Sequence, residues 1–78
     1  MKLTRHARNN IRLYKITETD ILETIHSPDL IDKEGEKLVA IKKFENRFSG
    51  YPLKIVYKRN KMLLFIITVY PLKKKYWR

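Results

Sequence analysis

Hydrophobic residues in the first part of the chain follow helical spacing. Four apolar residues recur every three or four positions and define one stripe: Leu3, Ala7, Ile11 and Tyr14. We therefore expect a helix over about 4–14, with the Thr4 side chain as its N-terminal cap. Polar residues lie on the opposite face of this helix: Arg5, Arg8, Asn9 and Arg12.

A second helix is predicted over about 18–27. Thr17 is followed three residues later by Asp20, which is the spacing of a capping box, where each side chain binds the backbone N–H of the other residue. Pro28 ends this helix, because the residue before a proline avoids helical backbone angles.

After the second helix, apolar and polar positions alternate, as is typical of strands. We predict strands at about 37–45, 52–59 and 62–70, and a further short strand is possible near 29–32. The segment 62–70 is apolar on both faces, so we expect it to be the central strand. Pro71 ends it.

The expected fold is α+β: two N-terminal helices pack on one face of a small twisted antiparallel β-sheet of three to four strands. The other face of the sheet is expected to stay open. The 78 residues suit one domain, 1–78, and its core is thin because so short a chain buries only about 60% of its unfolded surface. A ligand would therefore lie on an open face or in a shallow groove.

Charge is distributed very unevenly along the chain, whose net charge is +10. Residues 1–41 carry seven Lys or Arg and seven Asp or Glu, whereas residues 42–78 carry eleven Lys or Arg and one acid, Glu45. Such asymmetry implies an anionic partner, and we expect RNA, free or ribosome-bound. The alternative is a solvated surface, which usually mixes both signs.

The amino-acid composition narrows the class of protein further. The absence of cysteine excludes disulfides and thiolate metal sites. The longest apolar run, 62–70, is nine residues long, and a membrane helix needs roughly 20, so we expect no membrane contact and a cytoplasmic location. The absence of glutamine beside frequent lysine and isoleucine hints at a thermophilic source.

The open face of the predicted sheet carries the first candidate residues. Lys54 and Lys58 point to one side of their strand, and Thr68 and Tyr70 share one side of the last strand. The lysines would bind phosphates, and Tyr70 would donate a proton or stack on a base. An ordinary strand end is the alternative for Thr68 and Tyr70.

The basic tail, 71–78, interleaves cations with aromatic residues, which suits single-stranded nucleic acid. Its candidates for RNA contacts are Lys73, Lys74, Lys75, Tyr76 and Trp77. The alternative is a tail whose Trp77 packs on the edge of the core.

His6 is the candidate catalytic base. It lies in the first turn of the first helix, where the helix dipole and the neighbouring Arg5 and Arg8 favour the neutral imidazole. A neutral imidazole can take a proton from a ribose 2′-hydroxyl, while Arg47 and Lys54 would bind the scissile phosphate. The alternatives are a surface histidine with a structural hydrogen bond and phosphate contacts without chemistry.

No metal or cofactor site is expected. The chain has no HExxH motif, no paired metal-ligand spacing and only two glycines, too few for a nucleotide-binding glycine loop. An enzyme with this sequence would be a metal-free acid–base catalyst.

Four short segments, by their order and spacing, resemble a known family: 4–8 (TRHAR), 16–21 (ITETDI), 27–29 (SPD) and 66–70 (IITVY). The sequence is similar to a family of short uncharacterised bacterial and archaeal domains related to the RelE/BrnT-like toxins of type II toxin–antitoxin pairs. This resemblance implies the RelE-like toxin fold, metal-independent RNA cleavage and inhibition by an antitoxin protein, which we expect to be acidic. Among the candidate residues, His6, Thr68 and Tyr70 match the family pattern, and Arg47 matches it loosely.

Three functions are therefore considered. The leading hypothesis is a toxin endoribonuclease with His6, Arg47, Lys54 and Tyr70 as catalytic residues. The second is an RNA- or DNA-binding module without chemistry, and the third is a toxin that inhibits a protein target.

Overall fold

The structure is a computed structural model, and it describes residues 1–73. Its elements are, in chain order, β1 (Lys2–Leu3), α1 (Arg5–Tyr14), α2 (Glu18–His26), β2 (Leu30–Glu34), β3 (Lys37–Lys42), the 3-10 turn η1 (Phe48–Gly50), β4 (Leu53–Asn60) and β5 (Leu63–Pro71).

Both helices begin at the caps that the sequence predicts. The Thr4 hydroxyl accepts a hydrogen bond from the Ala7 N–H, at 3.0 Å. Thr17 and Asp20 form the complete capping box, with bonds of 2.9 and 3.0 Å. The structure therefore confirms both caps. They could be predicted because each depends only on residues three positions apart, so the local sequence is enough to specify it.

The sheet differs from the expected one. It has five strands in the order β1-β5-β4-β3-β2, and it is mixed, because β1 runs parallel to β5 while the other pairs are antiparallel. The prediction of an antiparallel, RelE-like sheet of three to four strands was therefore wrong, although the fold is still α+β. β1 was missed because two residues show no periodicity. The possible short strand near 29–32 overlaps β2, whose five residues are all exposed.

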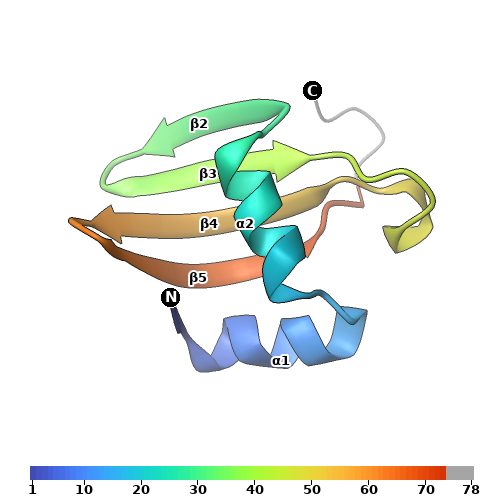
Figure 1. The fold of residues 1–78 in the computed structure, drawn as a ribbon, viewed down its shortest axis with the longest axis horizontal. Coiled ribbons are helices and arrows are strands. Elements are labelled where there is room, and N and C mark those ends of the chain that lie inside the picture. The colour runs from blue at the N-terminus through green and yellow to red at the C-terminus, as the bar shows by residue number, and fades with distance from the viewer. Residues whose placement is uncertain (74–78) are drawn as a thin grey trace.

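The prediction of a central strand at 62–70 was also wrong. β4 occupies the centre, and β5 lies between β4 and the short β1. Figure 1 shows α1 along the β5 side of the sheet, whereas α2 crosses in front of β3 and β4. The strand β5 is apolar on both sides partly because α1 packs against it.

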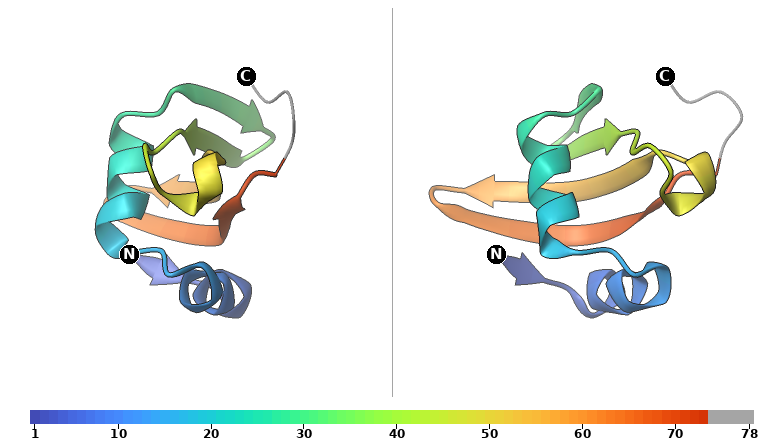
Figure 2. Two further views of the ribbon diagram at one scale, coloured as in Figure 1. Left: turned by 90° about the vertical axis from the view of Figure 1, so that its right-hand side faces the viewer. Right: turned by 45° about the vertical axis from the view of Figure 1, so that its right-hand side comes forward.

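The main core lies between the two helices and one face of the sheet. It contains Ala7 of α1, Ile21 and Ile25 of α2, and Leu53 and Ile55 of β4, all buried. Burying one such Leu or Ile side chain stabilises a fold by about 1.5–3 kcal/mol. The two views in Figure 2 show α2 lying across this face and α1 below it.

The opposite face of the sheet is only partly open. A second cluster of buried residues, Val39, Ile41 and Leu72, lies there, and Val56 and Tyr70 pack against it. The expected open face thus has an apolar centre, and its cations stand beside that centre.

Candidate nucleic-acid interface

The register of β4 and β5 brings several candidates to one face of the sheet. Lys54 lies opposite Tyr70, and Val56 lies opposite Thr68. Lys58 is two residues further along β4 and therefore points to the same side. We refer to Lys54, Val56, Lys58, Thr68 and Tyr70 as the basic sheet face.

Lys54 and Tyr70 form the closest cation–aromatic contact on this face. The Lys54 ammonium lies 5.8 Å from the centre of the Tyr70 ring, within the distance at which a cation is attracted to the ring face. Both residues are half-buried, and no carboxylate lies within ion-pair distance of Lys54 in residues 1–73. The pair therefore offers a phosphate-binding cation beside a ring on which a base could stack.

Lys58 has a weak anionic neighbour. Its ammonium lies 3.8 Å from a carboxylate oxygen of Glu36, whose side chain is almost fully exposed. An exposed ion pair of this kind contributes little to the stability of the fold and is readily screened by salt. Lys58 therefore stays available to a polyanion that offers several phosphates.

Thr68 is placed less favourably for a ligand contact. Its hydroxyl oxygen is buried and has no hydrogen-bond partner among the described residues. Just beside it, the pairing shifts, since Val56 pairs with Thr68 and Tyr57 with Ile66, which leaves Ile67 as the extra residue of a β-bulge. Bulges often lie next to functional sites, but the role of Thr68 in RNA contact stays a prediction.

The candidates at the start of α1 form a group separate from the Lys54–Tyr70 pair. The helix start is fixed to β5, because the Thr4 hydroxyl donates to the Ile67 carbonyl at 2.6 Å. His6 is exposed, and its Nε2 lies 3.5 Å from the Asn10 side-chain nitrogen. Arg5 and Arg8 are exposed as well. Within residues 1–73, no hydrogen bond or ion pair joins this group to Lys54 or Tyr70.

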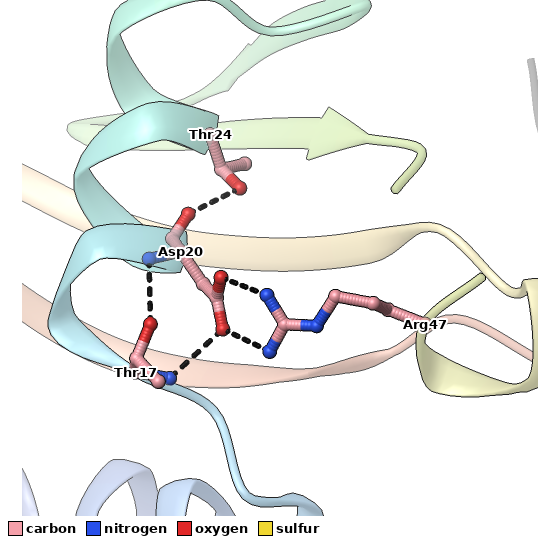
Figure 3. Close-up of polar contacts among 4 residues, drawn as sticks. All are labelled: Thr17, Asp20, Thr24 and Arg47. Atoms are coloured by element: carbon pink, nitrogen blue, oxygen red, sulfur yellow. Dashed lines mark hydrogen bonds and ion pairs between the residues drawn. The ribbon is translucent and has the colours of Figure 1, made fainter. Parts of the chain in front are cut away.

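Arg47 occupies a different position from the one its predicted role requires. Its guanidinium binds both carboxylate oxygens of Asp20 in α2, one of them at 2.6 Å (Figure 3). Asp20 belongs to the helix that covers the main core, whereas Lys54 lies on the other face of the sheet. The structure therefore does not bring Arg47 and Lys54 together around one phosphate.

The ion pair sets the protonation of both partners. Burial of Asp20, which is 3% exposed, acts to raise its pKa, but hydrogen bonds from Arg47 and Thr17 outweigh burial and hold the pKa below its ordinary value. The hydrogen bond to Asp20 in turn raises the pKa of Arg47. Arg47 also stacks over Phe48, with 4.8 Å from its central carbon to the ring centre. Figure 3 shows the carboxylate shared between the Thr17 backbone and the guanidinium.

A shallow groove of about 390 Å³ opens beside this ion pair. It is bounded by the end of α1, the loop before β4 and the end of β5, and its lining residues are Tyr14, Lys15, Asn46, Arg47, Phe48, Ser49, Pro71 and Lys73. We refer to these residues as the Arg47 groove. The Lys73 ammonium lies 5.8 Å from the centre of the Tyr14 ring.

The backbone of the Arg47 groove is strained. Positive φ angles occur at five non-glycine residues among those described, and four of them line the groove: Lys15, Asn46, Phe48 and Ser49. A left-handed conformation costs a non-glycine residue about 1–2 kcal/mol, and for a bulky residue such as Phe48 it is a clear outlier. Only Asn46, a type that tolerates this conformation, gave any hint of it in the sequence.

The candidates thus fall into three groups: the basic sheet face, the exposed start of α1, and Arg47 with Lys73 at the groove. Lys74, Lys75, Tyr76 and Trp77 lie outside the described residues. Sequence reasoning missed the partnership of Asp20 with Arg47, which are 27 positions apart, and it did not identify Tyr14, Lys15 or Ser49 as site residues.

Two further features of the described residues concern membranes and metal ions. None of the described helices is long and apolar enough to span a membrane. Residues 1–73 contain no group of three or more His, Asp or Glu side chains arranged to hold a metal ion.

The fold and these surfaces define a small, basic α+β protein with cations on both sides of its sheet. Residues 3–71 match the family described as Domain of unknown function (DUF4258), and the chain belongs to this family. The comparisons with curated proteins and with solved structures give no match.

Proposed function

We propose that this protein binds single-stranded RNA through the basic sheet face. The observation that carries the proposal is the Lys54–Tyr70 pair, where an ammonium without a carboxylate partner in residues 1–73 lies 5.8 Å from a half-buried aromatic ring. Phosphates and unpaired bases alternate along a single strand, and a cation beside a stacking platform matches both.

The charge of the chain supports the same proposal. From Asn46 to Arg78 the sequence contains no acid, so β4 and β5 bring no negative charge of their own to the face. The apolar cluster of Val39, Ile41 and Leu72 behind Tyr70 holds the ring against the sheet and limits the entropy lost on stacking. We propose RNA as the ligand, and not DNA, because the sequence resembles ribonuclease toxins.

RNA cleavage, as a toxin of the RelE/BrnT-like kind, is a second candidate. Its support is that the Tyr70 side chain, which carries a potential proton donor, lies beside Lys54, a potential phosphate ligand. In residues 1–73, neither His6 nor Arg47 forms a hydrogen bond or ion pair with Lys54 or Tyr70, so a cleavage site on the face would rest on Lys54 and Tyr70. Binding is the better supported function for that reason.

One experiment separates the two candidates. Purified protein is mixed with a fluorescent single-stranded RNA in excess EDTA, with and without ribosomes, and both anisotropy and chain length are recorded. Binding with intact RNA at every protein ratio supports the binding module. Cleavage that Tyr70→Phe abolishes, while anisotropy is retained, supports the ribonuclease. Absence of both signals contradicts the proposed function and favours a toxin with a protein target.

An acidic antitoxin is part of the toxin proposal. A negatively charged partner would cover the basic sheet face, and complementary charge would make association fast and salt-dependent. Reaction of the complex with a lysine-specific reagent tests this contact. Equal labelling of Lys54 and Lys58 in the free and bound protein would show that the antitoxin binds elsewhere. The proposal places both proteins in the cytoplasm.

A further inference from the structure

The Arg47 groove lies apart from the basic sheet face and has a composition of its own. Three cations converge on it from three segments: Lys15 after α1, Arg47 in the loop before β4, and Lys73 after β5. Asn46 and Ser49 add uncharged polar groups, and Tyr14 and Phe48 add two rings. Its volume of about 390 Å³ falls within the range of small-molecule sites, roughly 300–1,000 Å³.

The charge balance of the groove favours an anion. Lys15, Arg47 and Lys73 contribute +3, Asp20 contributes −1, and Glu23 of α2 attracts Arg47 more weakly than Asp20 does. The carboxyl end of α1 brings roughly −0.5 of partial charge nearby, and the three cations still outweigh these negative charges. The sign of this charge matches an anion such as a terminal phosphate.

Arg47 is held ready to bind such an anion. A guanidinium has five N–H donors, and the bonds to Asp20 use one on each terminal nitrogen. The other donors have no acceptor among the described residues, and the Arg47 side chain is 39% exposed. Asp20 and the Phe48 ring hold the guanidinium in one orientation, so little side-chain entropy is left to lose on binding.

The strained backbone is consistent with a binding role. Four non-glycine residues in left-handed conformations line one groove. Strained backbone is common at ligand sites, where the surrounding structure stabilises it. The Arg47–Asp20 hydrogen bonds stabilise the loop before β4, because they connect it to α2.

We infer that the Arg47 groove binds the phosphate of a phosphorylated nucleotide, with Lys15, Arg47 and Lys73 as phosphate ligands and the Tyr14 ring available to the base. The source of this phosphate is the end of an RNA strand or a free mononucleotide. The inference deepens the proposed RNA-binding function and rests on it, since an RNA on the basic sheet face would have its terminal phosphate recognised at a second place.

The test uses the full chain and three probes. These are a short RNA with a 5′-phosphate, the same RNA with a 5′-hydroxyl, and adenosine 5′-monophosphate. Affinities come from titration, and the site comes from amide chemical shifts of Asn46, Phe48 and Ser49. Lys15→Asn and Lys73→Ala remove one cation each, and asparagine tolerates the left-handed backbone at position 15. Lys33→Ala on the exposed strand β2 is the matched control.

The expected result is that at least one phosphorylated probe shifts the groove amides and binds about fivefold or more weakly to each groove variant, but not to Lys33→Ala. Preference for the 5′-phosphorylated RNA over its hydroxyl form identifies a strand end. Binding of adenosine 5′-monophosphate with comparable affinity identifies a free nucleotide. Equal affinity for both RNA forms, with no shift by the mononucleotide, would overturn the inference.

The two proposals can fail separately. A longer RNA of about 20 nucleotides with hydroxyl ends reports on the basic sheet face alone. If it binds and Lys54→Gln weakens it, while the groove responds to no phosphate, the proposed function stands and the groove inference falls. If the groove binds the mononucleotide but the longer RNA does not bind, RNA binding by the sheet face is the part that is wrong.

Discussion

Arg47 and Lys54 are two cations of the same acid-poor half of the chain, but the fold uses them in different ways. Arg47 is bound by the buried carboxylate of Asp20, and together they connect the loop before β4 to α2. Lys54 has no carboxylate within ion-pair distance in residues 1–73 and lies over the ring of Tyr70. The difference shows that the role of a cation in this protein depends on whether a carboxylate forms an ion pair with it. The residue type alone does not reveal this.

The largest effect should come from removing the paired cation. Arg47→Ala leaves the carboxylate of Asp20 buried with only the Thr17 N–H as a partner, so we expect a loss of about 2–3 kcal/mol, less than for a fully buried pair because Arg47 is 39% exposed. Thermal unfolding should show this as a fall in Tm of roughly 10–20 °C. Arg8→Ala, at an exposed helical site, is the control and should change Tm little. An equal Tm for the two variants would contradict a structural role for Arg47.

The same pair predicts a pH dependence. The folded-state pKa of Asp20 lies below its ordinary value of 3.8, so its contribution to stability is present above about pH 4 and is lost as the pH falls through the folded pKa. The stability gap between wild type and Arg47→Ala should therefore be largest near neutral pH and shrink below about pH 4. Chemical denaturation over this range measures it, and a gap that stays constant would exclude Asp20 as the partner that matters.

An intermediate effect is expected at the stacking platform. Tyr70→Ala should weaken RNA binding by roughly 5- to 100-fold, because stacking is worth about 1–3 kcal/mol per base, whereas Tyr70→Phe should keep most of the affinity. Anisotropy at a temperature well below unfolding measures both. Tyr51→Ala is the matched control, since Tyr51 is exposed on the turn after η1. Equal losses for Tyr70→Ala and Tyr51→Ala would contradict stacking on the sheet.

The smallest single effect should come from the unpaired cation. Lys54→Gln removes one phosphate contact, so RNA affinity should fall a few-fold at low salt, while Tm should change by less than about 3 °C because no ion pair is lost. This result would be the opposite of the Arg47→Ala result, which lowers stability most. A Tm loss for Lys54→Gln as large as that for Arg47→Ala would remove the distinction between the two cations.

The sequence predicted those parts of the molecule that depend on near neighbours. The caps at Thr4 and Thr17 and the alternation that puts Lys54 and Tyr70 on one face of the sheet could be predicted, because they rest on spacings of two to four residues. The parallel pairing of β1 with β5 could not, since Lys2 and Phe65 meet only in the folded chain.

The candidate site was predictable to a similar extent. Lys54, Lys58, Thr68 and Tyr70 were placed on one face, and the register agrees with this placement. The position of Arg47 was not predictable, because its partner Asp20 lies 27 residues earlier and the sequence pattern indicates only the capping role of Asp20. The groove was missed because its shape depends on left-handed backbone at Phe48 and Ser49, which side-chain type does not indicate.

The central claim is that RNA binds to the basic sheet face, and the salt dependence of binding tests it most directly. RNA affinity is measured between about 50 and 200 mM salt for wild type, for Lys54→Gln/Lys58→Gln, and for Lys33→Gln/Arg12→Gln, two exposed residues away from the basic sheet face, as a control with the same change in charge. Each phosphate contact contributes a slope of about −0.7 for single strands, so the first double variant should lose about 1.4 from the slope and the control almost nothing. Slopes that fall equally in both double variants, or that do not change in Lys54→Gln/Lys58→Gln, would contradict the claim.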